Sequence, residues 1–378
     1  MNIGFITPEY PLKNSSRSGG LGTSIKNLSI QLIAKGIGVT IFIVGAEEDE
    51  VIREDGIEFH LLKPKKLPFL TWWVSRKKYQ NYINSICLKN KIDVLEAPDW
   101  SGITAFMKFT RPLIIRLHGT DCFFCHLEKR KQKKKNFFLE KRALEGADAI
   151  IAVSNFVGKE TRDLFDLKKE IITIYNGIDS EVFTPLSIDR EEKTILYFGT
   201  VIRKKGVLEL AKAFKKVLEK DPEVRLKMVG KDSTDVFEGR STSGLIEEMF
   251  EEEERKQVEF IREIPYESVR EELAKATVVA LPSFAEAFPM TWLEAMAMEK
   301  PMLTSNIGWA NELMINGETG ITVDPSNTDD LANGILRLLN DREEAAAYGK
   351  NARKRIINRF SSSRVLEENI NFYNSLLT

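Results

Sequence analysis

The sequence is poor in cysteine and carries almost no net charge. Its 378 residues include only three cysteines, Cys87, Cys122 and Cys125. An odd number this small argues against a disulfide framework. The formal net charge is -1, so the chain as a whole lacks the basic excess typical of nucleic-acid-binding proteins. We therefore expect no nucleic-acid partner.

Long apolar runs and a secretory leader are also missing. No apolar run approaches the ~20 residues needed to span a bilayer. Met1 is followed by Ile3, Phe5 and Ile6, without a basic leader or a small-residue cleavage site. These absences predict a cytoplasmic protein. The 43% hydrophobic and 29% charged residues are typical of a globular protein, so we expect no extensive disorder.

Cys122, Cys125 and His126 match the C-x-x-C-H string of covalent haem attachment. That chemistry belongs to exported proteins, and we expect no export signal here. The alternative is a zinc site that also uses His118. A structural zinc site, however, normally draws on two well-separated ligand pairs. We therefore predict packed thiols and no metal.

Short apolar runs alternate with helical patterns along the first half of the chain. Ile25, Leu28 and Leu32 fall on one helical face, and Gly36 is suited to end that helix. The runs that predict buried strands are 3–7, 39–44, 92–95, 113–117, 149–153 and 171–174. Strands separated by helices indicate a parallel, doubly wound sheet.

The same alternation restarts after a charged, proline-containing linker at 179–193. The predicted strands are 194–198, 224–229, 258–261, 277–281 and 301–305, and the predicted helices include 208–219, 266–276 and 342–359. We predict an α/β protein with two Rossmann-like domains, 1–183 and 184–360, facing a cleft. Residues 361–378 are expected to form a C-terminal helix that packs back on the first domain. Such sheets bind ligands at the carboxyl ends of their strands.

The most informative motif lies at residues 281–298. A strand is predicted to end near Pro282, and a helix to begin around Pro289 and Met290. Free N–H groups at a helix start suit an anionic ligand such as a diphosphate. Glu294, about one turn into the helix, is placed to accept hydrogen bonds from ribose hydroxyls, and Glu286 from sugar hydroxyls. Taken alone, these glutamates also fit a surface residue and a local cap.

This segment resembles the Glu-x7-Glu signature of the family 4 retaining glycosyltransferases, whose two Rossmann-like domains form the GT-B architecture. Further shared motifs are Pro8 to Pro11, Gly19 to Gly22, Asn176 to Asp179, Gly230, and Asn316 to Gly320. The resemblance covers nearly the whole chain. It implies transfer of a sugar from a nucleotide diphosphate sugar to a glycan, lipid-linked or small-molecule acceptor, with no cofactor.

The loop from Gly199 to Gly206 resembles the family's diphosphate-binding loop, with one departure. The family has an arginine directly after the first glycine, where this chain has Thr200. We infer that Arg203 supplies the missing guanidinium. Arg203 and Lys205 would then neutralise the diphosphate in place of a divalent metal. The alternative is a solvated basic loop.

His118 follows the predicted strand 113–117, where the family has a histidine that contacts the transferred sugar. A lone histidine is more often structural, but the resemblance favours function. In the family's proposed mechanism the departing phosphate oxygen takes the acceptor proton, so no protein nucleophile is needed. The predicted catalytic-site residues are His118, Arg203, Lys205 and Glu286. The predicted donor-binding residues are Gly20, Gly22, Gly199, Thr200, Phe288, Pro289, Met290, Thr291 and Glu294.

The basic residues are concentrated in the first half of the chain. Residues 1–182 carry 28 Lys and Arg against 22 Asp and Glu, whereas residues 183–378 carry 27 against 34. Residues 63–78 interleave cations with Trp72 and Trp73, and residues 129–135 include Lys133 and Lys134. Tryptophan beside cations suits a membrane interface, so we predict contact with an anionic inner membrane face. The alternative is a solvated basic helix and a packed aromatic cluster.

Two other functions fit the same pattern. One is a GT-B-type sugar-nucleotide epimerase. The other is a catalytically silent nucleotide-sugar-binding partner subunit, which Thr200 in place of the family arginine keeps open.

Overall fold

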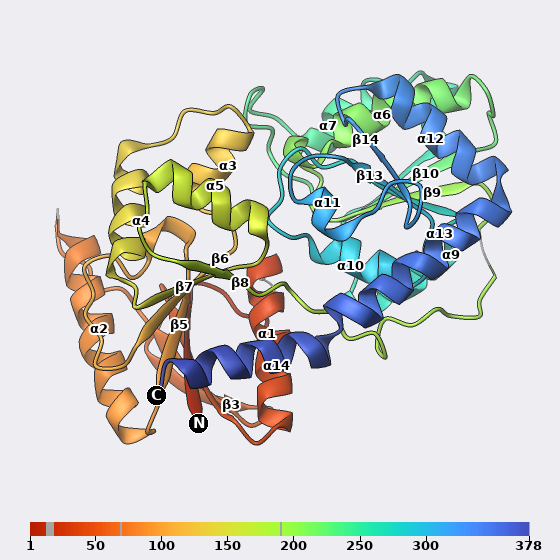
Figure 1. Cartoon of the computed structure of the whole chain (residues 1–378). Helices are drawn as coiled ribbons and strands as arrows, with labels where there is room; N and C mark the ends of the chain where they lie inside the picture. Colours follow the sequence, from red (N-terminus) through yellow and green to blue (C-terminus); the bar gives the residue numbers. More distant parts are fainter. Residues whose placement is uncertain (13–18, 69, 190, 378) are drawn as a thin grey trace. The chain divides into compact units, whose positions relative to one another are not determined.

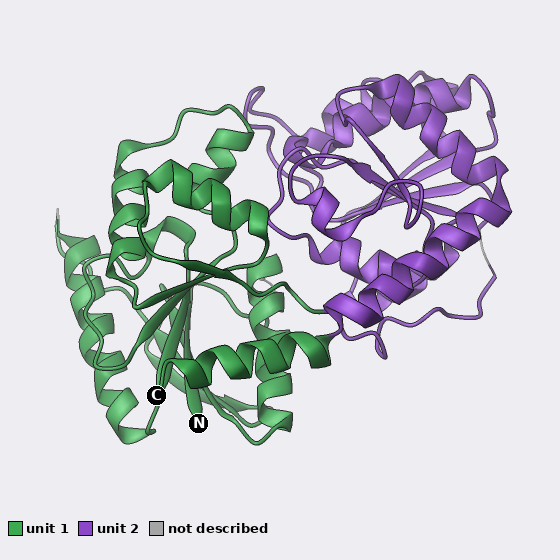
Figure 2. Ribbon diagram, in the orientation of Figure 1, with its two compact units in different colours: residues 1–177, 362–378 green, residues 178–361 purple. Residues whose placement is uncertain are grey.

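A computed structural model describes residues 1–12, 19–68, 70–189 and 191–377. These residues form two compact units, shown in separate colours in Figure 2. Unit 1 comprises Met1–Gly177 and Ser362–Thr378, and unit 2 comprises Ile178–Ser361. The chain thus passes between units after Gly177 and Ser361, whereas the sequence placed the boundaries after residues 183 and 360.

Unit 1 is built on an eight-stranded sheet of order β3-β4-β2-β1-β5-β6-β7-β8. The strands are β1 (Asn2–Thr7), β2 (Gly38–Val44), β3 (Glu50–Glu54), β4 (Ile57–Leu62), β5 (Val94–Pro98), β6 (Leu113–Leu117), β7 (Ala149–Ala152) and β8 (Ile171–Thr173). All neighbours pair in parallel except β3 and β4, which form an antiparallel hairpin. From β4 to β7 the order is that of a Rossmann sheet.

Helices cover both faces of this sheet (Figure 1). They are α1 (Gly20–Ala34), α2 (Thr71–Lys89), α3 (Asp121–Leu127), α4 (Lys134–Gly146), α5 (Asn155–Phe165) and α14 (Ser362–Ser375), with a 3-10 turn η1 at Trp100–Gly102. Side chains alternate between the two faces along a strand. On β1, Phe5 therefore packs in the core beneath α1 and α14, and Ile6 packs in the core of the other face, beneath α2.

A buried ionic network attaches α14 to the sheet of unit 1. Arg116 on β6 donates from Nε and an Nη to the two oxygens of Glu96 on β5, at 2.7 and 2.9 Å. The Tyr373 hydroxyl of α14 donates to the same carboxylate at 2.8 Å, and Asn369 Oδ1 accepts from Arg116. All four side chains are buried. The network explains why the last helix belongs to unit 1.

Unit 2 repeats the architecture with six parallel strands in the order β11-β10-β9-β12-β13-β14. The strands are β9 (Thr194–Phe198), β10 (Arg225–Val229), β11 (Val258–Ile261), β12 (Val278–Leu281), β13 (Met302–Ser305) and β14 (Ile321–Val323). This is the complete Rossmann order, with the first strand at the centre. The prediction of two doubly wound parallel sheets is therefore confirmed.

The helices of unit 2 also pack on both faces of the sheet. They are α6 (Val207–Leu218), α7 (Thr242–Glu247), α8 (Glu252–Arg255), α9 (Val269–Lys275), α10 (Met290–Ala297), α11 (Ala310–Leu313), α12 (Thr328–Asn340) and α13 (Arg342–Arg355). Helices α6 and α12 lie side by side on one face, and α10 and α13 on the other (Figure 1). In the described ranges, no helix of either unit combines the length and apolar character that crossing a bilayer requires.

Strands β3, β4 and β14 are absent from the predicted set, and helix 342–359 is shorter than predicted. The helix ends at Arg355 and continues as a π turn, Ile356–Phe360. Most other predicted strands match the observed ones within two residues, and 113–117, 194–198 and 258–261 match at both ends. Of the missed strands, β3 is mostly exposed and β14 has three residues, but β4 is mostly buried, so burial alone does not separate the predicted strands from the missed ones.

Removing Arg116 should be costly because it leaves the buried Glu96 carboxylate without its cation. We expect Arg116→Met to lower the free energy of unfolding by about 3–5 kcal/mol in urea denaturation. Arg53→Met is the matched control, since Arg53 pairs with Glu58 at 2.8 Å on the exposed edge of the same sheet. Its loss should be below about 1 kcal/mol. Equal losses in the two variants would contradict the role given to the network.

Candidate functional site

The strand order of unit 2 reverses between β9 and β12, and two loops emerge there from the carboxyl ends of these strands. In doubly wound sheets this switch point is where ligands bind. The first loop is Gly199–Gly206, which contains the short 3-10 turn η2 (Arg203–Lys205). The second is Pro282–Pro289, which leads into α10. The predicted donor and catalytic residues of unit 2 all lie on these two loops or on α10.

The two loops are held together through their backbones. The carbonyl of Lys204 accepts hydrogen bonds from Phe284 N at 2.8 Å and Ala285 N at 3.3 Å. Gly206 has φ +70°, and a Cβ there would lie 2.0 Å from the carbonyl oxygen of Pro282. Only glycine fits this position without displacing the second loop.

Lys205 and Glu286 meet between the loops. Lys205 Nζ lies 3.0 Å from Glu286 Oε1, and both side chains are mostly buried. Ser283 Oγ donates to the same oxygen at 3.3 Å. A Cβ on Gly199, whose φ is +130°, would lie 3.4 Å from Lys205 Nζ and 3.8 Å from Thr291 Cγ2. Four predicted site residues are therefore gathered in one place.

Helix α10 begins beside this cluster. Pro289 is its N-cap with extended backbone, and no side chain caps the first turn, which starts at Met290. Uncapped N–H groups and the positive end of the helix dipole suit an anion. Phe288, just before the helix, is buried and packs on Phe360 at 5.5 Å between ring centroids. This packing of Phe288 therefore holds the end of the Pro282–Pro289 loop in the core of unit 2.

Glu294 lies one turn into α10 and is almost fully buried. The hydroxyl of Tyr266 donates to Glu294 Oε1 at 2.7 Å. Burial raises the pKa of Glu294 to about 7, although the Tyr266 hydrogen bond and the charge of Lys205 act in the opposite direction. This carboxyl therefore titrates near neutral pH, which couples any hydrogen bond that it accepts to protonation.

Arg203 does not join the Lys205 cluster. Its guanidinium forms two hydrogen bonds to Asp235, at 2.6 and 3.1 Å, and lies over the Phe237 ring at 5.3 Å. The Asp235 side chain is completely buried and holds the turn after β10 by accepting from two backbone amides. Arg203 was predicted to replace the family arginine at the diphosphate. In this structure its guanidinium is paired with Asp235 instead. Thr200 is exposed, and its carbonyl accepts from Tyr197 at 2.7 Å.

In unit 1, His118 follows β6 at the carboxyl end of that sheet. The buried Asp99 carboxylate accepts from the backbone amides of His118 and Gly119, both at 3.1 Å, and so holds the turn. Burial, and then the charge of Arg116, lower the pKa of His118 to about 3. The imidazole is therefore neutral at physiological pH. Burial also raises the pKa of Asp99 to about 8, so this carboxyl is mostly protonated near neutrality.

The glycines before α1 face a carboxylate from their own unit. Glu9 Oε1 accepts from Gly19 N and Gly22 N, both at 3.0 Å. Gly20 is the first residue of α1, whose N-cap Gly19 makes no side-chain cap. The Gly22 amide predicted to lie near the donor phosphate is thus occupied by Glu9 in this structure.

Cys122 and Cys125 are buried on α3, and burial raises the pKa of Cys122 to about 12. The His126 side chain is exposed and lies 3.8 Å from Glu160. In the parts of the chain that the structure describes, no group of three or more His, Cys, Asp or Glu side chains is arranged to hold a metal ion. The nearby Glu140 carboxylate accepts hydrogen bonds from the backbone amides of Asp121 and Cys122 at the start of α3.

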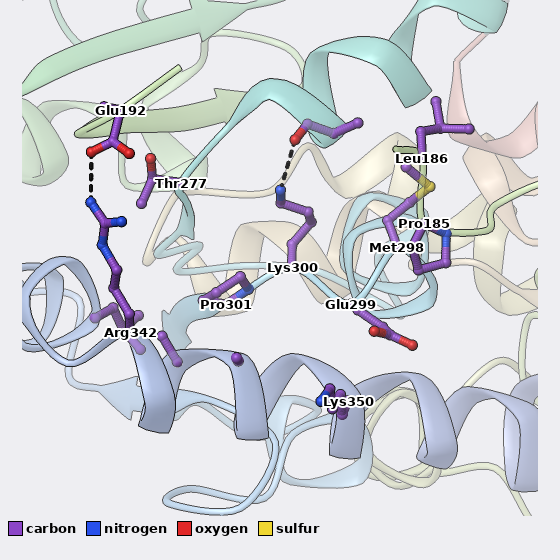
Figure 3. Close-up of a pocket in the computed structure, with 14 residues that line it drawn as sticks. Pro185, Leu186, Glu192, Thr277, Met298, Glu299, Lys300, Pro301, Arg342 and Lys350 are labelled. Carbon is purple, nitrogen blue, oxygen red and sulfur yellow. Dashed lines mark hydrogen bonds and ion pairs between the residues drawn. The ribbon is translucent and has the colours of Figure 1, made fainter. Parts of the chain in front are cut away.

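A separate cavity of about 180 Å³ lies in unit 2 around Pro301, at the amino end of β13 (Figure 3). Its polar side chains are partly paired: Lys300 donates to the Ala274 carbonyl at 3.1 Å, and Arg342 lies 2.6 Å from Glu192. None of the predicted site residues lines it. The cavity therefore belongs to the opposite end of the sheet from the loops that carry the candidate site.

Four residues that support the site were not among the predicted site residues: Glu9, Asp99, Asp235 and Tyr266. Glu9 and Asp99 had a usable signal, because each follows a buried strand closely, at the sheet edge where ligands bind. Asp235 and Tyr266 are more than 25 residues away in sequence from the residues they contact. Nothing in the local pattern indicates these pairs.

Two family models together match residues 18–355 of the chain. Residues 18–182 match the model described as Glycosyltransferase Family 4, and residues 179–355 match Glycosyl transferases group 1. The chain is also 26% identical to an uncharacterized glycosyltransferase of Methanocaldococcus jannaschii, over 99% of this chain and 98% of that protein.

Solved structures share the fold. Sucrose-phosphate synthase from Thermosynechococcus elongatus matches with a TM-score of 0.81 at 22% identity, covering 99% of this chain and 98% of that one. The Anabaena protein HepE, crystallised in complex with UDP-glucose, matches with a TM-score of 0.77 at 19% identity, covering 99% and 100%. The predicted GT-B fold is confirmed.

The contact between the two loops can be tested at Gly206. An alanine at either Gly206 or Gly239 costs about 1 kcal/mol, because both glycines have positive φ, +70° and +69°. Gly239 has open space around its Cβ direction, whereas Gly206 meets the Pro282 carbonyl. We therefore expect Gly206→Ala to lower the free energy of unfolding by at least about 2 kcal/mol more than Gly239→Ala, measured by urea denaturation. Indistinguishable variants would show that the loops do not need this contact.

Proposed function

We propose that the chain, which belongs to the family 4 glycosyltransferases, transfers a sugar from a nucleotide diphosphate sugar with retention of anomeric configuration and without a divalent metal ion. The observation that carries this proposal is the Lys205–Glu286 pair, 3.0 Å apart beside the uncapped start of α10. It combines a site for an anionic leaving group with a carboxylate that can hold sugar hydroxyls.

The diphosphate would bind at the first turn of α10, with Lys205 as its cation. Backbone N–H groups and the ammonium stabilise the negative charge that grows on the leaving phosphate as the glycosidic bond breaks. This role falls to Lys205 rather than Arg203, because Arg203 already makes a bidentate pair with the buried Asp235. A positive site of this kind can replace a bound cation.

The two glutamates would hold the two ends of the donor. Glu294 accepts from the ribose hydroxyls, and Glu286 from hydroxyls of the transferred sugar. The neutral imidazole of His118 can donate to or accept from a sugar hydroxyl, since its pKa is lowered to about 3. Each residue here orients the donor, which places the anomeric carbon for attack.

The proton of the acceptor hydroxyl would move as the new glycosidic bond forms and the bond to phosphate breaks. The acceptor hydroxyl attacks the anomeric carbon from the face that the phosphate leaves, and its proton passes to the departing phosphate oxygen. The products are the glycoside and the nucleoside diphosphate, so no protein group is consumed. Retention follows because entry and departure share one face of the sugar.

We propose a glycan, lipid-linked or small-molecule acceptor, and we choose a uridine donor as the first probe because HepE was crystallised with UDP-glucose. A cytoplasmic location fits the three free cysteines, Cys87, Cys122 and Cys125. Peripheral contact with the inner membrane face completes the proposal, because it would bring the enzyme to lipid-linked acceptors.

Donor hydrolysis in the absence of acceptor tests the reaction. With UDP-glucose the protein should release UDP and α-glucose, detected by proton NMR before mutarotation, and chelators should leave the rate unchanged. Lys205→Met and Glu286→Gln should each lower the rate by about 100-fold, whereas Lys220→Met, at an exposed position just after α6, should not. Release of β-glucose would refute retention. An altered sugar still joined to the nucleotide would indicate an epimerase, and binding without turnover a silent binder.

The pH dependence of donor binding tests Glu294. Ribose hydroxyls bond best to its charged form, so affinity for UDP-glucose should be full well above pH 7 and fall as pH drops through about 7. The limiting loss is about tenfold per pH unit. UDP-glucose is the suitable probe because its phosphates do not titrate in this range.

Donor affinity is measured by calorimetry at each pH, and two variants test whether Glu294 causes the pH dependence. Glu294→Gln should abolish this pH dependence. Tyr266→Phe should move it to higher pH, because it removes the hydrogen bond that lowers the carboxyl pKa. A wild-type affinity that stays flat between pH 6 and pH 8 (roughly one unit either side of the pKa) would refute the role given to Glu294.

A further inference from the structure

Four aromatic rings from three separate segments of unit 1 form one cluster. Trp72 and Trp73, at the start of α2, lie 5.6 Å apart between ring centroids. Phe106 lies 6.0 Å from each of them, and Phe138 of α4 lies 5.8 Å from Phe106. We call Trp72, Trp73, Phe106 and Phe138 the aromatic face. Helices α2 and α4 run along the same side of unit 1 (Figure 1).

This cluster lies at the surface and carries backbone strain. Trp72 is 36% exposed, Trp73 38% and Phe138 49%. Phe106 adopts φ +64°, a region that an aromatic residue occupies at a cost of about 1–3 kcal/mol. Contiguous exposed apolar surface of this kind marks an interaction site. The rings pack on one another, as the alternative interpretation of the sequence expected, but the cluster also remains partly exposed at the surface.

Each exposed ring is accompanied by a cation four residues later on the same helix. Arg76 lies over the Trp72 ring at 5.7 Å, Lys77 over Trp73 at 5.3 Å and Arg142 over Phe138 at 5.4 Å. The spacing places ring and cation on one helical face. Arg142 is shared with Glu145 at 3.0 Å, while Arg76 and Lys77 have no carboxylate partner among the described residues.

The start of α4 adds further positive charge. Lys133 is its N-cap, Lys134 and Lys135 follow, and all three are exposed. In the described ranges none of them has an ion-pair partner. Cations at a helix N-terminus oppose the helix dipole, so this arrangement costs stability unless an anion lies nearby. Lys77, Lys108 and Arg142 also line a hollow of about 690 Å³ beside Trp73 and Phe106, together with Glu145 and Asp148.

We propose that the aromatic face docks on an anionic lipid bilayer, with the indoles of Trp72 and Trp73 at headgroup level. Tryptophan rings favour the membrane interface, and each nearby Lys or Arg adds about 1 kcal/mol of attraction to anionic lipid. The exposed lysines 133–135, which have no ion-pair partner in the described ranges, and the partly exposed indoles supply the two components of such a surface. This docking deepens the peripheral location in the proposed function, but it requires no transfer chemistry.

Co-sedimentation with vesicles tests the docking without any donor or acceptor. The full chain should bind vesicles of equal phosphatidylcholine and phosphatidylglycerol at low salt, and bind phosphatidylcholine alone much more weakly. Trp72→Ala with Trp73→Ala should weaken binding at least about tenfold. Leu88→Ala is the matched control, because Leu88 is 65% exposed at the other end of the same helix; it should bind like wild type.

The cations are tested in the same assay. Lys133→Gln with Lys134→Gln, which removes two exposed charges, should lower binding by about tenfold and flatten its salt dependence. Lys89→Gln with Lys91→Gln removes the same charge near the end of α2 and should have a smaller effect. Circular dichroism melting of each variant identifies loss of folding.

Quenching by brominated phosphatidylcholine locates the rings. Trp292 and Trp309 are fully buried, so quenching of the wild type should come from Trp72, Trp73 and Trp100, which is 45% exposed. Trp72→Phe with Trp73→Phe keeps the aromatic face, so it should retain binding and leave only the quenching of Trp100.

Absence of wild-type binding at low salt would overturn the proposal, as would undiminished binding of the double alanine variant. Donor hydrolysis is measured separately. Its failure would leave the vesicle result standing, and a negative vesicle result would leave the transfer chemistry standing.

Discussion

The candidate site of unit 2 depends on one constraint, the backbone contact between the loops that follow β9 and β12. The Lys204 carbonyl binds the amides of Phe284 and Ala285, and Gly206 lets the Pro282 carbonyl come close. The loops are therefore registered by main-chain atoms, which do not depend on side-chain rotamers. Lys205 then meets Glu286, and α10 starts beside them. Positioning by backbone is what a reaction without a protein nucleophile requires, since its rate depends on geometry and charge.

The two units use buried charge differently. In unit 1 the Glu96–Arg116 pair is saturated by Tyr373 and Asn369, so its role is to attach a helix. In unit 2 Lys205, Glu286 and Glu294 lie at the carboxyl end of the sheet, and burial leaves Glu294 titrating near neutrality. Paired charges that are fully satisfied stabilise structure, whereas a carboxyl held near its titration point is available to a ligand.

Much of this architecture follows from the sequence, because strands buried on both faces leave continuous apolar runs such as Ile195–Phe198 and Val278–Leu281. The hairpin β3–β4 escaped prediction because β3 is mostly exposed and polar, although Asp55-Gly56 is a recognisable turn signal with both φ positive. Site residues on local motifs, such as Lys205 and Glu286, come together as expected. The partner of Arg203 could not be foreseen, since Asp235 reaches it from the turn after a neighbouring strand. The local sequence pattern specifies the helices and strands, whereas side-chain pairs between distant residues depend on how the loops pack.

The return of α14 to unit 1 has a consequence for biosynthesis. N-terminal domains usually fold first as a chain leaves the ribosome. Here Tyr373 and Asn369, which complete the ionic network around Arg116, are made only after the whole of unit 2. In a nascent unit 1, Glu96 and Arg116 therefore lack two of their hydrogen-bonding partners until all of unit 2 has been translated. Unit 1 begins to fold first, but its structure is completed only after that of unit 2.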